Sequence, residues 1–232
     1  MTEQLVFELA APEPPSFANF LPGRNAEALS TVERLASGQI AETGVFLWGA
    51  PGAGKTHLLR AAIRAVEARG AAAVYLAEPG ALVAHDAQWL ATRSVVAIDS
   101  IDQATAEEQG RLFTLFNGLD SHGGHLIAAS RVAQTQLAVR DDLRTRLGWG
   151  LVYEIAVLAD ADKPAALAGF ARRRGFRLAD DVIEYLLVHG RRDMPALLDT
   201  LSALDRHSLA TKRAITVPML RGWLQREIGL DR

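Results

Sequence analysis

Short apolar runs alternate with amphipathic stretches along the first two thirds of the chain. Each run has only five to seven residues, and runs of this length are typical of strands buried on both faces of a parallel sheet. The runs are Gly44–Trp48, Ala72–Leu76, Ser94–Ile98, His125–Ala129 and Leu151–Val157. Apolar residues recur at helical spacing between most of them, as in His57–Arg69. Strands separated by helices predict an α/β fold with a parallel sheet.

One of the predicted helices has a recognisable start. Thr105 is a suitable N-cap, and Glu107 and Glu108 then lie in the first turn, where carboxylates stabilise the helix dipole. The apolar residues that follow at helical spacing are expected to be buried, and they are Leu112, Phe113, Leu115, Phe116 and Leu119.

The pattern changes after about Leu158, where strand-like runs stop. Helical segments follow at about Lys163–Arg174, Asp181–His189, Met194–Ser208 and Pro218–Ile228, which predict a small all-helical lid. Near the other end, residues 10–16 contain three prolines, which favour an extended linker. We therefore divide the chain into a tail (1–9), a linker (10–16), an α/β core (17–158) and a helical lid (159–232).

Composition excludes several classes of protein. No apolar run approaches the roughly 18 to 20 residues that a membrane span needs, and residues 1–9 lack the layout of a signal peptide. We therefore expect a cytoplasmic protein that does not engage membranes. The chain has no cysteine, which excludes disulfides and thiolate metal sites. A net charge of -2 argues against a protein that holds nucleic acid chiefly through a general positive field.

A glycine-rich loop follows the first predicted strand. Residues 49–56 read GAPGAGKT, in which Gly49, Gly54, Lys55 and Thr56 occupy the fixed positions of the Walker A pattern. Glycines let backbone N–H groups surround phosphates at a helix N-terminus. Lys55 is expected to reach the β and γ phosphate oxygens, and the Thr56 hydroxyl to ligate Mg²⁺. The sequence thus predicts a site for a nucleoside di- or triphosphate.

A carboxylate ends the third strand-like run. In VVAID the carboxylate of Asp99 has the Walker B position, from which it holds Mg²⁺ through the water shell of the ion. AAA+ ATPases usually place a glutamate at the next position, but Ser100 stands here and cannot act as an effective base. We therefore expect slow intrinsic hydrolysis. For Asp102 we expect an exposed capping or surface role and assign no catalysis.

Two further positions have a chemical and a purely structural interpretation. Ser130 follows an apolar strand and fits the sensor-1 position, which contacts a γ-phosphate; ordinary turn chemistry is the alternative. Arg144 and Arg146 end a probable helix, and one of them is a candidate arginine finger. A guanidinium aimed at a neighbouring subunit's γ-phosphate is worth about 10³ to 10⁵ in rate. The alternative is a helix end that carries arginines only for its dipole.

Four segments together resemble a known family. FANF, GKTHLL, VVAIDSI and LRTRLGWGLVYEI are similar to the AAA+ region of DnaA, and the likeness runs over essentially the whole chain; these segments begin at Phe17, Gly54, Val95 and Leu143. The chain resembles the DnaA/Hda family, and within it the members responsible for regulatory inactivation of DnaA. Within that family we expect a member without the long N-terminal domain of DnaA and without the helix-turn-helix domain that follows the lid in DnaA.

This resemblance implies an AAA+ P-loop core with a helical lid and a negative regulator of chromosomal replication initiation. Arg146 matches the finger that acts in trans on ATP bound by DnaA and leaves inactive ADP-DnaA. The regulator's own nucleotide, ADP or ATP with Mg²⁺ held by Thr56 and Asp99, is structural. Phe17 and Asn19 lie near the adenine, and Ser130 takes the sensor-1 position. The other nucleotide-binding positions are Gly49, Pro51, Gly52, Ala53, Gly54, Lys55 and His57.

The tail resembles a clamp-binding peptide of the same family. Gln4, Leu5, Phe7 and Leu9 are expected to enter pockets of the DNA polymerase III sliding clamp, the β subunit, although alternating apolar residues also suit an edge strand. The partners implied are DnaA and the clamp, with DNA contacted only through the clamp and a location at the nucleoid or replisome. Self-association through the finger surface is a further expectation of the fold.

One position departs from the family pattern. Pro195 stands where the sensor-2 helix usually carries an arginine, and Arg191 or Arg192 is a candidate to compensate. The cluster Arg172, Arg173, Arg174 and Arg177 is interpreted as a solvated helix end, with contact to DNA or DnaA as the alternative. We interpret His122, His125 and Asp120 as a polar turn rather than a metal site.

Other functional classes remain open. A DnaC-like helicase loader or transposition helper needs its own water-activating acid and a basic surface for DNA, and both Ser100 and the net charge count against it. A P-loop kinase for a small molecule should have an acceptor-site base and a basic closing lid. A nucleotide-binding clamp adaptor, in which Arg146 is idle, is compatible with the sequence.

Overall fold

A computed structural model describes residues 14–230 of the protein. The chain divides after Val157 into two compact units, each with its own core. The first unit comprises Pro15–Val157, and the second contains the helices that follow Leu158.

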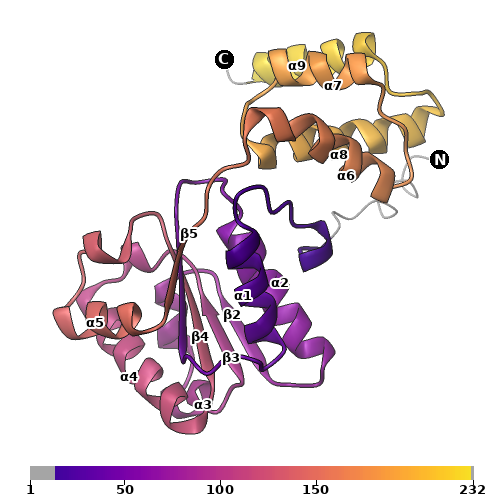
Figure 1. Ribbon diagram of the computed structural model, residues 1–232. Helices are drawn as coiled ribbons and strands as arrows, with labels where there is room; N and C mark the ends of the chain where they lie inside the picture. Colours follow the sequence, from indigo (N-terminus) through magenta and orange to yellow (C-terminus); the bar gives the residue numbers. More distant parts are fainter. Residues whose placement is uncertain (1–13, 231–232) are drawn as a thin grey trace. The chain divides into compact units, whose positions relative to one another are not determined.

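A five-stranded parallel sheet forms the middle of the first unit (Figure 1). Its strands are β1 (Gly44–Trp48), β2 (Ala73–Leu76), β3 (Val95–Ile98), β4 (His125–Ser130) and β5 (Leu151–Glu154), in the order β2-β3-β4-β1-β5. All neighbouring strands are parallel, which confirms the predicted fold class. Trp48 pairs with Ser130, and Ile98 pairs with Ala128, so the carboxyl ends of the three central strands lie side by side.

The prediction that all five strands are buried on both faces is wrong for the two outer ones. β1, β3 and β4 are buried almost throughout, but β5 alternates between half-buried and exposed residues, and most of β2 is half-buried. β2 and β5 are the edges of the sheet, where only one neighbouring strand lies beside each of them. Central position in the sheet, which the apolar run does not reveal, decides this burial.

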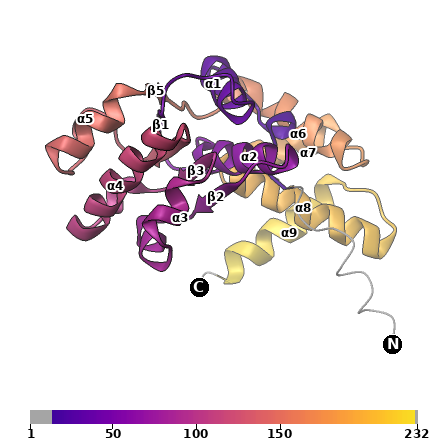
Figure 2. The same cartoon turned by 90° about the horizontal axis from the view of Figure 1, so that it is seen from below.

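Helices cover both faces of the sheet. α1 (Ala26–Ala36) and α2 (Lys55–Ala68) lie on one face, whereas α3 (Ala87–Ala91), α4 (Ala106–His122) and α5 (Asp141–Trp149) lie on the other (Figures 1 and 2). Alternate residues of β1 belong to different hydrophobic cores. Val45 and Leu47 pack with residues of α1 and α2, whereas Phe46 packs with residues of α4 on the other face of the sheet. Short 3₁₀ helices complete the unit at Phe17–Asn19 (η1), Pro79–Ala84 (η2), Ile101–Gln103 (η3) and Gln134–Gln136 (η4).

The predicted start of α4 is confirmed. Thr105 and Glu108 form a reciprocal capping box, in which each side chain accepts the backbone N–H of the other residue. Four of the five predicted apolar positions are buried in the core, and Phe113 is only partly buried.

The second unit is all-helical, as predicted. After a short 3₁₀ turn, Asp160–Asp162 (η5), it contains α6 (Lys163–Arg173), α7 (Asp180–His189), α8 (Met194–Thr211) and α9 (Val217–Leu230). Apolar residues of all four helices form one core, which includes Leu167, Leu186, Leu201 and Leu220. No helix in residues 14–230 is long and apolar enough to cross a membrane.

A buried ion pair corrects one prediction about this unit. Arg174 Nε donates to Asp205 Oδ2 at 2.8 Å, and their side chains are 11% and 6% exposed. Arg174 therefore does not belong to a solvated helix end, in contrast to Arg172, Arg173 and Arg177, which are exposed. The pairing partner lies 31 residues away in sequence, on α8, and so was not visible as a local pattern.

Candidate nucleotide-binding site

The glycine-rich loop joins β1 to α2 and turns sharply at glycines. Gly49 and Gly54 have φ angles of 149° and 101°, which favour glycine. A Cβ on Gly49 would lie 2.3 Å from the carbonyl oxygen of Ile155, and one on Gly54 would lie 2.8 Å from the ring of Phe20. The loop therefore keeps its close backbone packing only with glycine at both positions. Its remaining residues, Ala50, Pro51, Gly52 and Ala53, lie between them.

Lys55 begins α2, and its ammonium group turns back into this loop. Nζ donates to the carbonyl oxygens of Gly49 at 2.6 Å and Ala50 at 2.9 Å, and the residue is 8% exposed. Burial lowers the pKa of Lys55 below its ordinary value, although Asp99 and Asp102 attract the charge and act in the opposite direction. A buried ammonium held inside a glycine loop is suited to accept phosphate oxygens as additional partners.

Asp99 and Thr56 are brought together at the carboxyl end of β3. The Thr56 hydroxyl donates to Asp99 Oδ2, and the N–H of Ser100 donates to Oδ1 at 2.8 Å. Asp99 is 7% exposed. A hydroxyl and a carboxylate are oxygen ligands of the kind that Mg²⁺ takes in combination with phosphates and water. The described residues contain no cluster of three or more His, Cys, Asp or Glu side chains suited to a metal, so this pair fits an ion that arrives with a nucleotide.

Tyr75 belongs to the same site and was missed by the sequence analysis. Its hydroxyl lies 3.4 Å from Asp99 Oδ2 and donates to it, and the Arg60 guanidinium lies 4.9 Å from the ring centroid. Burial raises the pKa of Tyr75, which keeps the phenol protonated as a donor. The only available signal was a polar tip in an apolar run, and the pairing of β2 with β3 was needed to place it.

The prediction that Asp102 is exposed is wrong. Its side chain is 9% exposed and accepts two bonds from Arg131, from Nε at 2.8 Å and from the backbone N–H at 3.1 Å. Burial alone would raise the pKa of Asp102, but the hydrogen bonds and charge of Arg131 outweigh it and hold this pKa below the usual range. Asp102 is thus a structural carboxylate that fixes Arg131, the residue directly after Ser130, beside the carboxyl ends of β3 and β4.

Ser130 ends β4 next to the loop, and its hydroxyl takes part in a turn. Oγ donates to the carbonyl oxygen of Val132 at 2.8 Å and accepts the Val132 N–H at 3.0 Å. Its own carbonyl accepts the N–H of Gly49 at 3.2 Å. The structure therefore places Ser130 beside the glycine loop with its hydroxyl in turn bonds, and its sensor-1 role stays a prediction.

The segment predicted to lie near the adenine contacts the first turn of α2. Ser16 caps η1, in a reciprocal capping box with Asn19. His57 Nε2 donates to the carbonyl oxygen of Ser16 at 2.8 Å, and the His57 and Phe20 rings are 5.5 Å apart. Phe17, in η1, packs against the same core. Phe17, Asn19 and His57 are thus brought together at one side of the loop.

The structure separates the two candidate finger residues. The Arg144 guanidinium is fixed on its own element and the preceding loop, because it donates to Asp141 Oδ1 at 2.9 Å and to the carbonyl oxygens of Val139 at 2.8 Å and Leu137 at 3.3 Å. Arg146 forms no ion pair with any carboxylate in residues 14–230 and lies over the ring of Trp149, at 4.2 Å from its centroid. Arg144 is therefore tied to its own backbone and to Asp141, and the finger role of Arg146 stays a prediction.

Several predicted positions lie in the lid or beyond the described part of the chain. Pro195 is the second residue of α8, which begins after the N-cap Asp193. The first turn of a helix tolerates a proline. Arg191 pairs with Asp193 at 3.4 Å, and the Arg192 carbonyl accepts Lys163 Nζ at 2.7 Å, so compensation by either arginine stays a prediction. The tail positions lie outside the described residues, namely Gln4, Leu5, Phe7 and Leu9.

The histidines near β4 make local contacts. His122 Nδ1 lies 2.7 Å from the Gly118 carbonyl, and His125 Nδ1 lies 3.0 Å from the Glu42 carbonyl. They belong to no group of three or more possible metal ligands among the described residues.

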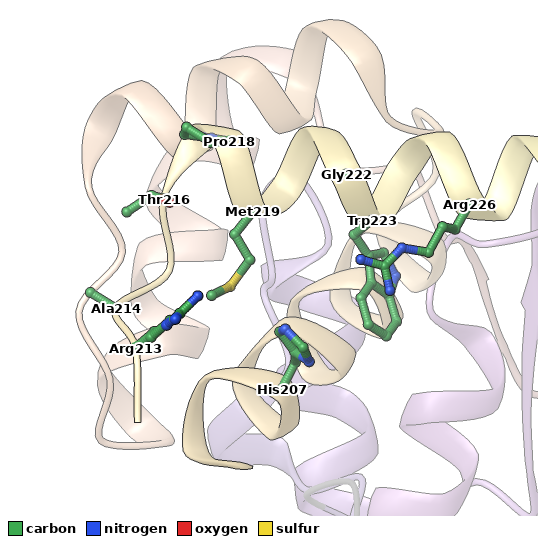
Figure 3. Close-up of a pocket in the computed structure, with 9 residues that line it drawn as sticks. All are labelled: His207, Arg213, Ala214, Thr216, Pro218, Met219, Gly222, Trp223 and Arg226. Carbon is green, nitrogen blue, oxygen red and sulfur yellow. The ribbon is translucent and has the colours of Figure 1, made fainter. Parts of the chain in front are cut away.

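The lid contains a cavity of its own, of about 540 Å³ (Figure 3). It lies between the end of α8 and the first turns of α9, and none of its lining residues is acidic. The indole N–H of Trp223, on its wall, is buried without an acceptor among the described residues. The residues that line it are His207, Arg213, Ala214, Thr216, Pro218, Met219, Gly222, Trp223 and Arg226. This cavity has no glycine loop and no carboxylate, so it is unlike the site at β1 and β3.

Comparison with known proteins places the chain beside replication initiators. Residues 160–224 match the family described as Hda, lid domain. The fold resembles a crystal structure of a DNA replication initiation factor (TM-score 0.71, 24% identity, 88% of this chain and 69% of that one). It also resembles AMPPCP-bound DnaA from Aquifex aeolicus (0.73, 23%, 85% and 66%) and domain III of Thermotoga maritima DnaA (0.78, 19%, 94% and 98%). The chain spans about two thirds of the length of the first two proteins. Structural similarity at 19–24% sequence identity establishes the fold.

Proposed function

We propose that this chain is a member of the DnaA/Hda family of AAA+ proteins, because residues 160–224 match the Hda lid-domain family and the fold resembles that of DnaA. In this proposal it is a negative regulator of replication initiation that stimulates hydrolysis of ATP bound by DnaA. The observation that carries the proposal is the contrast between the chain's own nucleotide site and its candidate arginine finger. The nucleotide site has Ser100, after β3, where a water-activating acid is needed, whereas Arg146 is a half-exposed guanidinium without a carboxylate partner in residues 14–230. Such a chain is equipped to complete another protein's site.

The chain's own nucleotide, ADP or ATP, has a structural role in this proposal. Backbone N–H groups of the loop 49–54 and the Lys55 ammonium hold the phosphates, and Thr56 and Asp99 orient Mg²⁺. Bound Mg²⁺ neutralises phosphate charge there. Tyr75 and the Ser100 N–H fix the Asp99 carboxylate, which leaves no base next to it. The contact of η1 with His57 supports the assignment of Phe17 and Asn19 to the base.

Arg146 is proposed to act on the γ-phosphate of ATP in DnaA. A guanidinium in that place stabilises the charge that develops on the transferred phosphoryl group. Loss of the Arg146 guanidinium should lower the stimulated rate of hydrolysis roughly 10³-fold, the lower end of the range for arginine fingers. Ser130 and Arg131, on the nucleotide side of the chain, take no part in this step.

The tail is proposed to bring the chain to the sliding clamp. Gln4, Leu5, Phe7 and Leu9 supply a polar anchor and alternating apolar side chains, which suit an extended peptide in apolar pockets. Binding to a clamp on DNA raises the local concentration of the regulator near DnaA without a new contact to DNA. This explains how a chain with a net charge of -2 works at DNA.

The test follows labelled ATP that is bound to DnaA before the assay begins. DNA-loaded clamp is added with the wild-type chain, with Arg146→Ala or with Gln4→Ala. We expect acceleration with wild type, none with Arg146→Ala at any concentration, and recovery of Gln4→Ala at high concentration, because the tail contributes only proximity. Arg111→Ala is the matched control, since Arg111 is a half-exposed arginine of α4 that pairs with Glu107 in its own helix.

Two outcomes would contradict the proposal. If the wild-type chain gives no acceleration with loaded clamp, a loader or clamp-adaptor function replaces it. If Arg146→Ala accelerates hydrolysis as well as wild type, the chain acts on DnaA without an arginine finger.

A further inference from the structure

Trp149, the last residue of α5, is unusually exposed. The residue is 64% exposed, whereas tryptophan side chains are on average largely buried because they carry so much apolar surface. Exposed tryptophan and arginine side chains that lie together are typical of the residues that dominate protein interfaces. The position of Trp149 therefore calls for a physical explanation.

The backbone around Trp149 is fixed, so its exposure does not result from a loose chain end. A Cβ on Gly150 would lie 2.0 Å from the carbonyl oxygen of Gly44, which presses this residue against the start of β1. A Cβ on Gly148 would lie 2.8 Å from Gln134 Nε2, and the same amide donates to the carbonyl oxygen of Arg144. The backbone is thus closely packed on both sides of Trp149, while the tryptophan itself stays exposed.

The exposed indole carries the guanidinium of Arg146. The Cζ atom lies 4.2 Å from the ring centroid, well inside the range of a cation–π contact. Stacking uses the face of the planar guanidinium and leaves its in-plane N–H donors for oxygen acceptors. Arg144, two residues earlier, donates instead to Asp141 and to two backbone carbonyl oxygens. The only support that the described residues give the Arg146 head group is thus an aromatic one.

We propose that Trp149 is the positioning residue for Arg146, and that the pair forms the surface that docks on the nucleotide-bearing face of a partner AAA+ module. The indole holds the guanidinium in one orientation before docking, so fewer rotamers are lost when its N–H groups meet the γ-phosphate. The partner must offer a phosphate for the guanidinium beside apolar area for the indole edge. This inference rests on the proposed function, because it concerns the same guanidinium.

Positioning and simple anchoring predict different kinetics. An indole that orients Arg146 affects the maximal stimulated rate, because it changes the fraction of docked complexes with a correctly placed guanidinium. An indole that only buries apolar area affects the concentration needed for half-maximal stimulation. A cation–π contact at an exposed site corresponds to roughly a two- to fivefold effect.

The experiment compares Trp149→Phe with Trp149→Leu in the assay with ATP-loaded DnaA and loaded clamp. Phenylalanine keeps a π face, whereas leucine keeps apolar area without one. We expect the maximal rate of Trp149→Phe to stay within twofold of wild type and that of Trp149→Leu to fall about two- to fivefold. Trp89→Leu is the matched control, because Trp89 is 43% exposed and carries Arg93 at 4.4 Å in the same kind of contact, on α3.

A spectroscopic measurement separates this inference from the proposed function. The indole should shift the side-chain proton resonances of Arg146 upfield in the free wild-type chain, and Trp149→Leu should abolish that shift. Absence of the shift in wild type overturns the positioning role, as does a full maximal rate in Trp149→Leu. A wild-type chain that shows the shift but gives no stimulation of DnaA instead overturns the proposed function.

Discussion

Replacing Lys55 by methionine tests whether the glycine loop is a nucleotide site. Methionine keeps most of the length of the side chain but removes the ammonium that donates to Gly49 and Ala50. Hydrogen bonds from a charged donor contribute about 1.5–3 kcal/mol, but burial of the ammonium, which already lowers its pKa, opposes this gain. We therefore expect the stability of the nucleotide-free protein to change by no more than about 2 kcal/mol.

The nucleotide-bound protein should respond far more strongly. A nucleotide at 100 times its Kd stabilises the folded state by about 2.7 kcal/mol. Loss of a charge-assisted contact to the phosphates, worth about 3 kcal/mol, raises Kd roughly 150-fold and leaves about 0.3 kcal/mol of stabilisation at the same concentration. For a unit the size of Pro15–Val157, roughly 3–4 °C per kcal/mol gives a shift of about 8–10 °C for wild type and about 1 °C for Lys55→Met.

Calorimetric melting with ADP and Mg²⁺ measures this difference. Lys163→Met is the matched control, because Lys163 is also a buried lysine, bonded to Asp160 and to the Arg192 carbonyl, but it belongs to the lid, where it begins α6. We expect this control to lower the melting temperature of the nucleotide-free protein and to leave the ADP-dependent shift of the core intact. An undiminished shift in Lys55→Met would refute the assignment of this loop to the phosphates.

Three further predictions concern stability. Asp205→Ala should destabilise the lid by about 3–5 kcal/mol in urea titrations, because it leaves the buried Arg174 charge without this partner; a loss below 1 kcal/mol would show that the pair is not buried in solution. Gly222→Ala should stabilise the same unit by about 1 kcal/mol, since an added Cβ meets nothing within 4 Å inside α9, and a lower melting temperature would contradict this packing. The lowered pKa of Asp102 means that its pairing with Arg131 stabilises the fold above pH 4 and ceases to do so as the pH falls through the folded pKa. Arg131→Ala should therefore be less stable than wild type at pH 7, and the difference should shrink as the pH falls through the folded pKa of Asp102; a difference that stays constant down to acid unfolding would exclude the ion pair as the cause.

The local elements were predictable because their signals are local. Each apolar run corresponds to one strand, and the lid helices begin within one residue of their predicted starts, since caps, prolines and helical spacing lie within a few residues of one another. Contacts between distant segments were not predictable in the same way. Asp102 was expected at the surface, and only the adjacent ends of β3 and β4 bring it to Arg131, 29 residues away. Tyr75 reaches Asp99 through the pairing of β2 with β3, which has no counterpart in the sequence of either strand.

The sequence by itself determined the glycine loop, the carboxylate after the third strand and the resemblance to the DnaA/Hda family, because each depends on residue types at fixed short spacing. Spacing alone left Arg144 and Arg146 equivalent, since both are arginines of the same predicted helix, and only the family resemblance pointed to Arg146. The tertiary structure gives the two side chains different surroundings, because the carbonyls of Leu137 and Val139 accept hydrogen bonds from Arg144, whereas Arg146 lies over the exposed indole of Trp149. A hydrogen bond to a folded backbone and a stacking partner are set by three-dimensional packing, which spacing along the chain does not encode.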